Sequence, residues 1–463
     1  MTLIKSISGI RGTIGGKPSD ALTPIDIVKF TASYVTLMKE TVGDKRKQIV
    51  VGRDARISGS MVDSIVCGTL NAMGVDVFNV GLSTTPTVEV AVTELKADGG
   101  IILTASHNPK QWNALKLLNN EGEFLNAAEG EQILKIAEKE AFSFADVDDI
   151  GSTTIVKDMI EKHIDKVLEL SLVDVQAITN ANFSVAIDAV DSTGGIAIPK
   201  LLKKLGVKNI IEINCEPTGD FSHNPEPIPE NLTEISDKLK GGIADVGFVV
   251  DPDVDRLAVI CEDGTMFNEE YTLVAVADYV LQHTKGNTVS NMSSSRALRD
   301  VTEKYGGEYA ASAVGEVNVV TMMKENKAVI GGEGNGGIIY PEAHYGRDSL
   351  VGVALFLTHL AKSGMKVSEL KKTYPEYVIS KNKIALTPSI DVDDILRKME
   401  EKYSDYPVNT IDGVKVEFEK EWVHLRKSNT EPIIRIYSES KTKEDADKLA
   451  NRIIVDIKNI AGL

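Results

Sequence analysis

Residues 245–256 read DVGFVVDPDVDR, an apolar run followed directly by three aspartates at alternating positions. The apolar part predicts a buried strand, and the apolar LAVI at 257–260 indicates that the acidic loop lies against a packed core. Three carboxylates this close together repel one another unless a cation lies among them. A ligand set made only of oxygens favours Mg²⁺ or Ca²⁺. The candidate metal ligands are Asp251, Asp253 and Asp255.

Two other interpretations of this acidic loop stay open. A phosphatase of the haloacid-dehalogenase type would use the first aspartate after the strand, Asp251, as a nucleophile, whereas a solvated acidic turn would have no chemical role. An EF-hand is excluded, because Arg256 stands where that motif requires glycine and because strands, not helices, flank the loop.

The strand at 245–250 ends a unit that occurs three times along the chain. Each unit reads strand, helix, strand, helix, strand and then a polar loop. The predicted strands are 48–54, 75–81 and 99–105, then 183–190, 209–215 and 245–250, and finally 287–292, 309–314 and 328–332. Such alternation predicts three α/β layers with mainly parallel, covered strands. Ligands bind beyond the carboxyl ends of such strands, where TASHNP (104–109), DPDVDR (251–256) and GEGNGG (332–337) all fall.

The C-terminal part has a different pattern. Three consecutive strands at 414–419, 422–428 and 433–439 precede a helix at 443–460, which predicts a small α+β domain. We expect its structure to begin at TPSIDVDD, residues 387–394.

Length, charge and cysteine content limit the possible functions. A chain of 463 residues suggests three or four domains, and the net charge of −17 argues against nucleic-acid and membrane-surface partners. We therefore expect a small-molecule ligand and a monomer or homodimer. An anionic ligand would need a local group of basic side chains. No apolar run is long enough to span a membrane, no signal peptide is evident, and three scattered cysteines form no disulfide framework, so we expect a cytoplasmic protein.

Ser106, in TASHNP, is either a turn residue or a nucleophile at the end of a strand. His107 is a candidate catalytic partner, although neighbours on a loop cannot be assumed to form a base–nucleophile pair. Lys116 supplies positive charge nearby or is a surface lysine, and both interpretations stay open.

Two basic turns and one glycine-rich loop are candidate binding elements. LRKSNTEPIIRI, residues 425–436, gathers two arginines with hydroxyl and amide groups, a combination suited to phosphate, although a solvated hairpin turn is the alternative. Its candidate residues are Arg426, Ser428, Asn429, Thr430 and Arg435. Arg11 lies in a glycine-flanked turn. The glycines of GEGNGG would let Glu333 and Asn335 approach a polar ligand closely.

Four of these motifs, in this order, resemble those of the α-D-phosphohexomutase superfamily across essentially the whole chain. They are TASHNP, DPDVDR, GEGNG and RKSNTEP. The resemblance implies a heart-shaped α/β enzyme of four domains, each contributing one loop to a single cleft. The implied domains are 1–155, 156–265 and 266–375, all α/β, and the α+β domain 376–463.

The resemblance also implies roles for the candidate residues. Ser106 would carry a phosphoryl group and, with Asp251, Asp253 and Asp255, hold Mg²⁺. Arg11, Lys116, Arg256 and His107 would lie beside the transferring group, and Glu333 and Asn335 would bind sugar hydroxyls. The 425–436 loop would anchor the phosphate that is not reacting. Phosphate would move between the 6- and 1-positions of a hexose phosphate through a hexose 1,6-bisphosphate.

The motifs depart from the family pattern at two places. Pro252 and Val254 stand where relatives often have glycine or alanine, and Gly337 stands where many bacterial relatives have histidine. His344 is near in sequence, but nothing in the sequence places it in the cleft. Phosphoglucosamine mutase is the favoured activity, with phosphomannomutase/phosphoglucomutase as the alternative. A metal-dependent phosphatase and a non-catalytic sugar-phosphate sensor are less favoured, because a hydrolase needs no second phosphate anchor and a sensor needs no catalytic residues.

Overall fold

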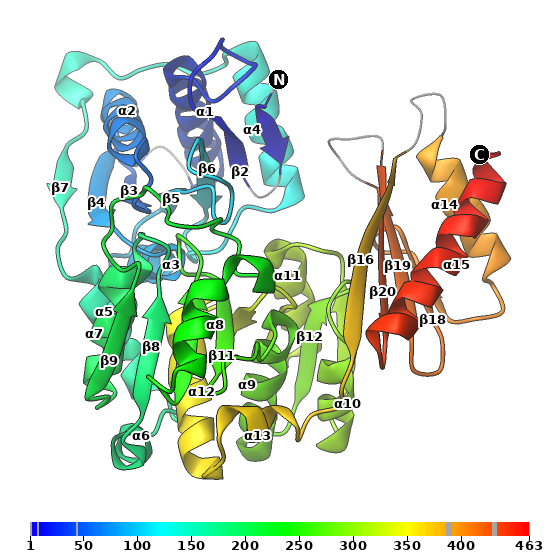
Figure 1. Ribbon diagram of the computed structural model, residues 1–463. Coiled ribbons are helices and arrows are strands. Elements are labelled where there is room, and N and C mark those ends of the chain that lie inside the picture. The colour runs from blue at the N-terminus through cyan, green and yellow to red at the C-terminus, as the bar shows by residue number, and fades with distance from the viewer. Residues whose placement is uncertain (1, 7–8, 43–44, 386–390, 428–432, 463) are drawn as a thin grey trace.

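The computed structural model describes residues 2–6, 9–42, 45–385, 391–427 and 433–462. They form four sheets, each with its own helices, and each sheet belongs to one domain (Figure 1). The predicted strands of the three repeated units are all present, within two residues at each end. Within this described part, none of the helices is both long enough and apolar enough to span a bilayer.

Domain I contains a sheet of seven strands in the order β1-β2-β6-β5-β3-β4-β7. The strands are β1 (Ile4–Ser6), β2 (Gly9–Thr13), β3 (Gln48–Arg53), β4 (Asp76–Leu82), β5 (Gly99–Leu103), β6 (Trp112–Leu118) and β7 (Thr153–Ile155). The helices are α1 (Pro24–Val42), α2 (Gly59–Ala72), α3 (Thr85–Glu94) and α4 (Ala127–Lys139). Thr84 caps α3, because its side chain accepts a hydrogen bond from the backbone N–H of Thr87.

Domains II and III each have a four-stranded sheet, ordered β11-β10-β8-β9 and β13-β12-β14-β15. Domain II comprises α5 (Met159–Glu169), α6 (Val175–Ala181), β8 (Ser184–Asp188), α7 (Gly194–Lys204), β9 (Asn209–Ile213), α8 (Thr233–Lys240), β10 (Val246–Val250) and β11 (Leu257–Cys261). Domain III comprises α9 (Glu269–His283), β12 (Asn287–Asn291), α10 (Ala297–Lys304), β13 (Tyr309–Ser312), α11 (Glu316–Asn326), β14 (Ala328–Glu333), β15 (Gly337–Ile339), α12 (Ser349–Ser363) and α13 (Val367–Lys371).

The three α/β sheets share one topology that the sequence only partly predicted. In each, three parallel strands are followed by a fourth, antiparallel strand, which is β6, β11 or β15. The polar loop of each unit therefore connects the last parallel strand to the antiparallel one. Because these two strands form a hairpin, both ends of the polar loop lie at the same edge of the sheet.

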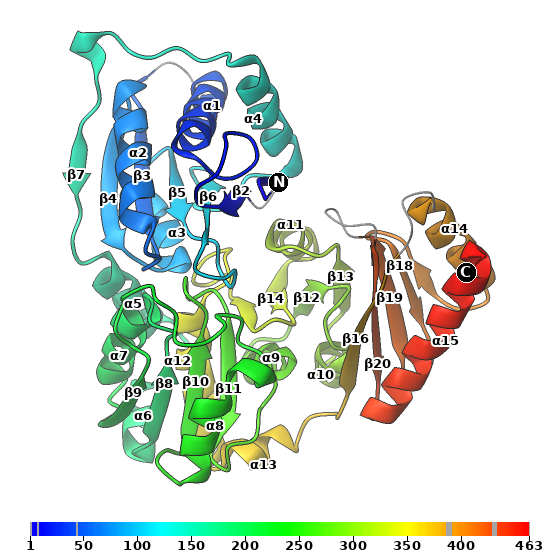
Figure 2. The same cartoon turned by 45° about the horizontal axis from the view of Figure 1, so that its top comes forward.

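Domains II and III pack as one body around a shared core. Phe248 of β10 lies edge-to-face against Phe356 of α12, with ring centroids 5.9 Å apart. Domain IV has a separate core and lies beside domain III in both views (Figures 1 and 2). A bidentate ion pair between Arg299 and Glu417, at 2.6 Å, joins these two domains.

Domain IV is an antiparallel sheet in the order β16-β20-β19-β18-β17, covered by two helices. Its elements are β16 (Val378–Ala385), α14 (Val392–Lys402), β17 (Val408–Asn409), β18 (Val414–Glu417), β19 (Trp422–Lys427), β20 (Ile433–Ser440) and α15 (Lys443–Ala461). The expectation that this domain begins at residues 387–394 was wrong, because β16 already pairs along its whole length with β20. The alternating apolar residues of β16 are interrupted by lysines and an asparagine, which concealed the strand.

Candidate active site

Ser106 follows β5 and meets the acidic loop that follows β10 in domain II. Its hydroxyl donates a hydrogen bond to Oδ2 of Asp251 at 2.8 Å. The backbone of Ser106 is left-handed, with φ of 49°, and its N–H donates to the Thr104 hydroxyl at 2.9 Å. A non-glycine residue held in this region costs of order 1–3 kcal/mol and needs support from its surroundings.

Arg56 supplies much of that support, although the sequence did not single it out. Its guanidinium is fully buried and donates to the backbone carbonyls of four residues of the serine loop, which are Ser106, Asn108, Pro109 and Trp112. Its Nε also donates to the buried carboxylate of Asp54 at 3.0 Å. The forked shape of arginine lets one side chain collect these acceptors, which a lysine could not do.

The acidic loop has the chemistry of a cation site. Asp251, Asp253 and Asp255 are fully buried, and one oxygen from each lies within 4.8 Å of the others. Within the described residues, Oδ1 of Asp253 and Oδ1 of Asp255 have no hydrogen-bond partner. Burial, followed by repulsion from Asp255 and Asp253, raises the pKa of Asp251 well above its ordinary value. Buried oxygens without donors, on three clustered carboxylates, fit a hard divalent cation such as Mg²⁺.

The backbone of this loop is strained at Val254, where the sequence departs from the family pattern. Val254 has φ of 65°, which is rare for a β-branched residue and natural for glycine. The hydroxyls of Ser192 and Thr193 donate to the carbonyl of Pro252 at 2.7 and 2.8 Å, and the N–H of Val254 donates to the carbonyl of Asp251. These hydrogen bonds hold the loop in a backbone conformation that is unfavourable for valine.

Lys116, which lies on β6, faces the same carboxylates. Its Nζ is 2.8 Å from Oδ2 of Asp253 and 3.3 Å from Oδ2 of Asp255. Burial would lower the pKa of Lys116, but the two aspartates raise it above its ordinary value. The Thr85 hydroxyl at the start of α3, which the sequence did not indicate, donates to Oδ2 of Asp253 at 2.5 Å. Burial would raise the pKa of Asp253, but Lys116 and Thr85 lower it, so this carboxylate is charged.

His107 lies next to the serine hydroxyl. Its Nδ1 is 3.3 Å from Oγ of Ser106. The positive charge of Arg256, followed by burial, lowers the pKa of His107 well below its ordinary value. The imidazole is therefore uncharged near neutral pH and can exchange a proton with a neighbouring oxygen.

Arginines from three domains approach the acidic loop. Burial, then Arg256 and Arg435, lower the pKa of Arg11, so Arg11 lies close enough to be repelled by each of these two charges. Within the described residues, the Nε atoms of Arg11 and Arg256 are buried without a hydrogen-bond partner. Buried cationic donors that lack acceptors fit an anion such as a phosphoryl group.

Glu333, the last residue of β14, and Asn335, in the turn between β14 and β15, lie beside this site. Glu333 Oε1 accepts from the Asn291 side chain at 2.7 Å, and Nδ2 of Asn335 lies 3.4 Å from Glu333 Oε2. Burial would raise the pKa of Glu333, but Arg347 and the Asn291 hydrogen bond lower it. The carboxylate therefore presents a negative charge.

Arg347 joins Glu333, at the end of β14, to the acidic loop, and the sequence did not indicate it. Its guanidinium contacts Glu333 at 2.8 Å, Asp255 at 2.7 Å and Glu316 at 2.9 Å. A side chain at position 337 would place its Cβ 2.3 Å from Cδ of Arg347. Gly337, the second departure from the family pattern, therefore leaves room for this arginine.

His344 does not take the place of the histidine that many bacterial relatives have at the position of Gly337. It lies between two carboxylates, with Nδ1 3.3 Å from Glu89 and Nε2 3.1 Å from Asp348. Although burial lowers it, the bonds to Asp348 and Glu89 raise the pKa of His344 to about 10.

The basic residues of domain IV form a row across three adjacent strands. Arg426 of β19 is paired in register with Arg435 of β20, which is paired in turn with Lys383 of β16. Like charges directly opposite one another on a sheet are destabilising unless an anion compensates them. Arg426 also forms an ion pair with Asp412 at 2.8 Å. Ser428, Asn429 and Thr430 lie outside the described residues.

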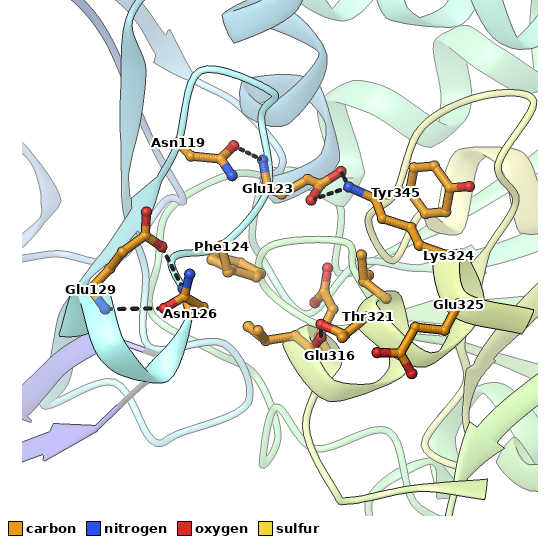
Figure 3. A pocket seen from close by; sticks show the side chains of 12 residues that line it. Asn119, Glu123, Phe124, Asn126, Glu129, Glu316, Thr321, Lys324, Glu325 and Tyr345 are labelled. Atoms are coloured by element: carbon orange, nitrogen blue, oxygen red, sulfur yellow. Dashed lines mark hydrogen bonds and ion pairs between the residues drawn. The ribbon is translucent and has the colours of Figure 1, made fainter. Parts of the chain in front are cut away.

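A pocket of about 280 Å³ opens next to this site, between domains I and III. Figure 3 shows its acidic lining, in which Lys324 reaches across to Glu123 at 2.6 Å. Two residues of the pocket wall contact the groups already described, because Glu316 bonds to Arg347 and the ring centroid of Phe124 lies 5.5 Å from Nζ of Lys116.

The fold and the site define a class of phosphoryl-transfer enzyme, and models of protein families identify it. The phosphoglucomutase/phosphomannomutase models of domains I, II, III and IV match residues 3–144, 161–264, 268–377 and 381–455. The chain therefore belongs to the phosphoglucomutase/phosphomannomutase family, the α-D-phosphohexomutases. It is a mutase, an isomerase that transfers phosphoryl groups within its substrate.

Relatives with curated names cover nearly the whole chain. A Thermococcus kodakarensis protein named phosphoglucomutase/phosphomannomutase is 36% identical over 94% of this chain and 95% of its own. A Sulfurisphaera tokodaii phosphoglucosamine/phosphogalactosamine mutase is 32% identical, covering 96% and 97%. Other archaeal relatives are named probable phosphoglucosamine mutases. Among solved structures, a Burkholderia thailandensis family member has a TM-score of 0.85 at 25% identity, covering 99% and 98%.

Proposed function

We propose that this mutase interconverts glucosamine 6-phosphate and glucosamine 1-phosphate through a phosphorylated Ser106. The observation that carries the proposal is the convergence on one site of a serine hydroxyl, a carboxylate cluster and basic residues from three domains. A mutase needs two phosphate positions, one where transfer takes place and one that holds the other end of the substrate. The acidic loop with Arg11 and Arg256 suits the first, and the row of Arg426, Arg435 and Lys383 suits the second.

The reaction divides into two transfers between oxygens. The free hydroxyl of the sugar loses its proton and bonds to phosphorus as the bond from phosphorus to Ser106 Oγ breaks, and Ser106 Oγ gains a proton, which yields a hexose 1,6-bisphosphate. The bisphosphate then reverses its orientation, and its other phosphoryl group returns to Ser106. His107, uncharged and 3.3 Å from Ser106 Oγ, can exchange a proton with that oxygen as the phosphoryl group leaves or arrives.

The residues around Ser106 stabilise the transferring group by charge. Mg²⁺ held by Asp251, Asp253, Asp255 and Ser106 would neutralise charge that develops on the phosphoryl oxygens. Arg11 and Arg256 would add positive charge there, since in the described part of the chain their buried Nε atoms lack a hydrogen-bond partner, and Lys116 orients Asp253 and Asp255. We propose that a sugar phosphate is the only partner needed, with hexose 1,6-bisphosphate as intermediate and activator.

The preference for an amino sugar rests on the charge of Glu333. An ionised carboxylate can pair with a protonated 2-amine as well as accept hydrogen bonds from hydroxyls. The names of several archaeal relatives favour the same substrate. A second candidate function is the interconversion of glucose phosphates or mannose phosphates, which the name of the 36% identical relative favours.

The deciding measurement is kcat/KM for glucosamine 6-phosphate, mannose 1-phosphate and glucose 1-phosphate under one set of conditions. We expect glucosamine 6-phosphate to be preferred. A preference of tenfold or more for a neutral sugar, about 1.4 kcal/mol in transition-state binding, would favour the second candidate. Stimulation by a trace of hexose 1,6-bisphosphate is expected of a mutase, whereas release of inorganic phosphate as the main product would indicate a phosphatase.

A further inference from the structure

A second group of metal-binding side chains lies where domains I, II and III meet. His163 of α5, His344 in the loop before α12 and Asp348 at the start of α12 each place one ligand atom within 4.8 Å of the other two. His163 and Asp348 are each 1% exposed, and the His344 side chain is 15% exposed. The group shares no residue with the acidic loop, although both contact α3, which bonds to Asp253 through Thr85.

The two imidazole rings make the same pattern of contacts, although their planes are 80° apart. Each directs its Nε2 at Oδ2 of Asp348, from 2.8 Å for His163 and 3.1 Å for His344. Each Nδ1 is held by a side chain of α3, because Thr87 Oγ1 lies 2.9 Å from His163 and Glu89 Oε2 lies 3.3 Å from His344. Histidines that bind metals have this arrangement, since a hydroxyl or carboxylate on one ring nitrogen orients the other toward the ion.

The charges of the group also favour a divalent cation. Asp348 and Glu89 bring two carboxylates into a buried region, and Glu89 is only 2% exposed. Among the described residues, neither oxygen of Glu89 has a well-formed hydrogen bond, and its ion pair is with His344. A divalent ion held between the two rings, whose centroids are 6.1 Å apart, would neutralise the two carboxylates.

We propose that His163, His344 and Asp348 bind a first-row divalent cation, with Zn²⁺ preferred over Mg²⁺ because two ligands are nitrogens. Tetrahedral bonds of the usual Zn–N and Zn–O lengths separate ligand atoms by about 3.3 Å, so the two distances from Asp348 to the imidazole nitrogens need to open by at most about half an ångström. Because His163 belongs to domain II, and Asp348 and His344 to domain III, the ion fixes these domains to each other and, through Thr87 and Glu89, to domain I.

The test is the metal content of the full-length protein in Mg²⁺ buffer with added Zn²⁺, measured after gel filtration. To exclude binding at the acidic loop, the measurement uses the Asp253→Asn variant beside the wild type. We expect close to one Zn²⁺ per chain in both, and Co²⁺ in its place should give the visible absorption of a low-coordinate nitrogen–oxygen site. His163→Gln should lower the affinity at least tenfold, whereas His223→Gln, at a histidine bonded to Asp188, should not.

Thr87→Val keeps both rings and removes only the hydroxyl that orients His163, so it covers the case in which His163→Gln fails to fold. Loss of the Thr87 hydroxyl that bonds to Nδ1 of His163 should weaken Zn²⁺ binding by about 10- to 100-fold. The proposal is overturned if Asp253→Asn retains no Zn²⁺, because the ion would then belong to the acidic loop. The proposal is also overturned if the wild type and His163→Gln bind equal amounts of Zn²⁺.

Discussion

The hydroxyl oxygen of Ser106 lies 2.8 Å from Oδ2 of Asp251, although 145 positions separate the two residues. A phosphoryl group on this serine would lie among the carboxylates of the acidic loop and near Arg11 and Arg256, whose Nε atoms have no hydrogen-bond partner within the described residues. The geometry therefore places the proposed phosphate acceptor beside the groups that would stabilise the transfer, and it leads to the first prediction.

Purified protein should contain a population about 80 Da heavier, the mass of one phosphoryl group, which peptide mapping should assign to Ser106. Ser106→Ala should abolish mutase turnover, because no other hydroxyl in the described site faces Asp251. Ser64→Ala is the matched control, since Ser64 bonds only to the Ser60 carbonyl on the exposed side of α2. Full activity of Ser106→Ala would eliminate the phosphoserine mechanism.

Removal of divalent metal should abolish turnover, and Mg²⁺ should restore it, because Asp253 and Asp255 have buried oxygens without donors. Asp253→Asn should lower kcat at least 100-fold, about 2.7 kcal/mol in the barrier, while the protein stays folded. Asp263→Asn is the control, because Asp263 caps the exposed turn after β11 and bonds to Thr265. Metal-independent activity of Asp253→Asn would show that the loop is only a structural turn.

Arg56→Lys should slow phosphoryl transfer without changing sugar binding. Lysine keeps the charge beside Asp54 but cannot serve the four carbonyls of the serine loop, and each lost buried bond costs about 1–3 kcal/mol. We expect kcat to fall at least tenfold at nearly constant KM, with slower phosphorylation of Ser106 by hexose 1,6-bisphosphate. Arg46→Lys, at the exposed pair with Asp76, should behave as wild type. If Arg56→Lys changes only thermal stability, the arginine does not position the serine.

Arg426→Ala should weaken the binding of sugar phosphates, measured by calorimetry, by roughly 2–5 kcal/mol if the charge pair is desolvated. Lys383→Ala should have a smaller effect, because Lys383 reaches Arg426 only through Arg435 in the strand register. Arg397→Ala removes a surface arginine of α14 that pairs with Asp394 and Glu401, and it should leave affinity unchanged. Equal affinity in the Arg426 and Arg397 variants would remove the phosphate-anchoring role.

Ionisation of the buried Glu270 carboxyl should make the protein less stable as the pH rises. Burial raises the pKa of Glu270 to about 8, so the folded protein keeps a proton that the unfolded chain loses near its ordinary pKa of about 4.3. Between these values the folded state binds more protons, and the contribution of Glu270 to the free energy of unfolding falls by about 1.4 kcal/mol per pH unit.

Denaturant unfolding of wild type and Glu270→Gln, compared between about pH 5 and pH 7, tests this sign. The variant should lose less stability over the interval, because its amide does not titrate. Glu269→Gln, at the neighbouring residue that pairs with Lys381 at 3.5 Å, serves as the control. Parallel pH profiles for wild type and Glu270→Gln would contradict the assignment.

The sequence by itself determined the repeated α/β units and the position of each polar loop. Apolar strands and amphipathic helices are local patterns, and a loop that follows a parallel strand must lie at the carboxyl edge of the sheet. For the same reason Ser106 and Asp251 could be recognised as site residues before their distance was known. The loop motifs were also enough to indicate the family.

Only the tertiary structure decided which residues support that site. Arg56, Thr85, Lys383 and Arg347 come from segments with no recognisable motif, and their roles arise from contacts across strands, loops and domains. Likewise only the structure shows that His344 lies between Glu89 and Asp348 and does not stand in for a histidine at position 337. Local sequence patterns record which face of an element is buried. The partners of a buried charge depend on how distant segments pack, and only the folded chain specifies that.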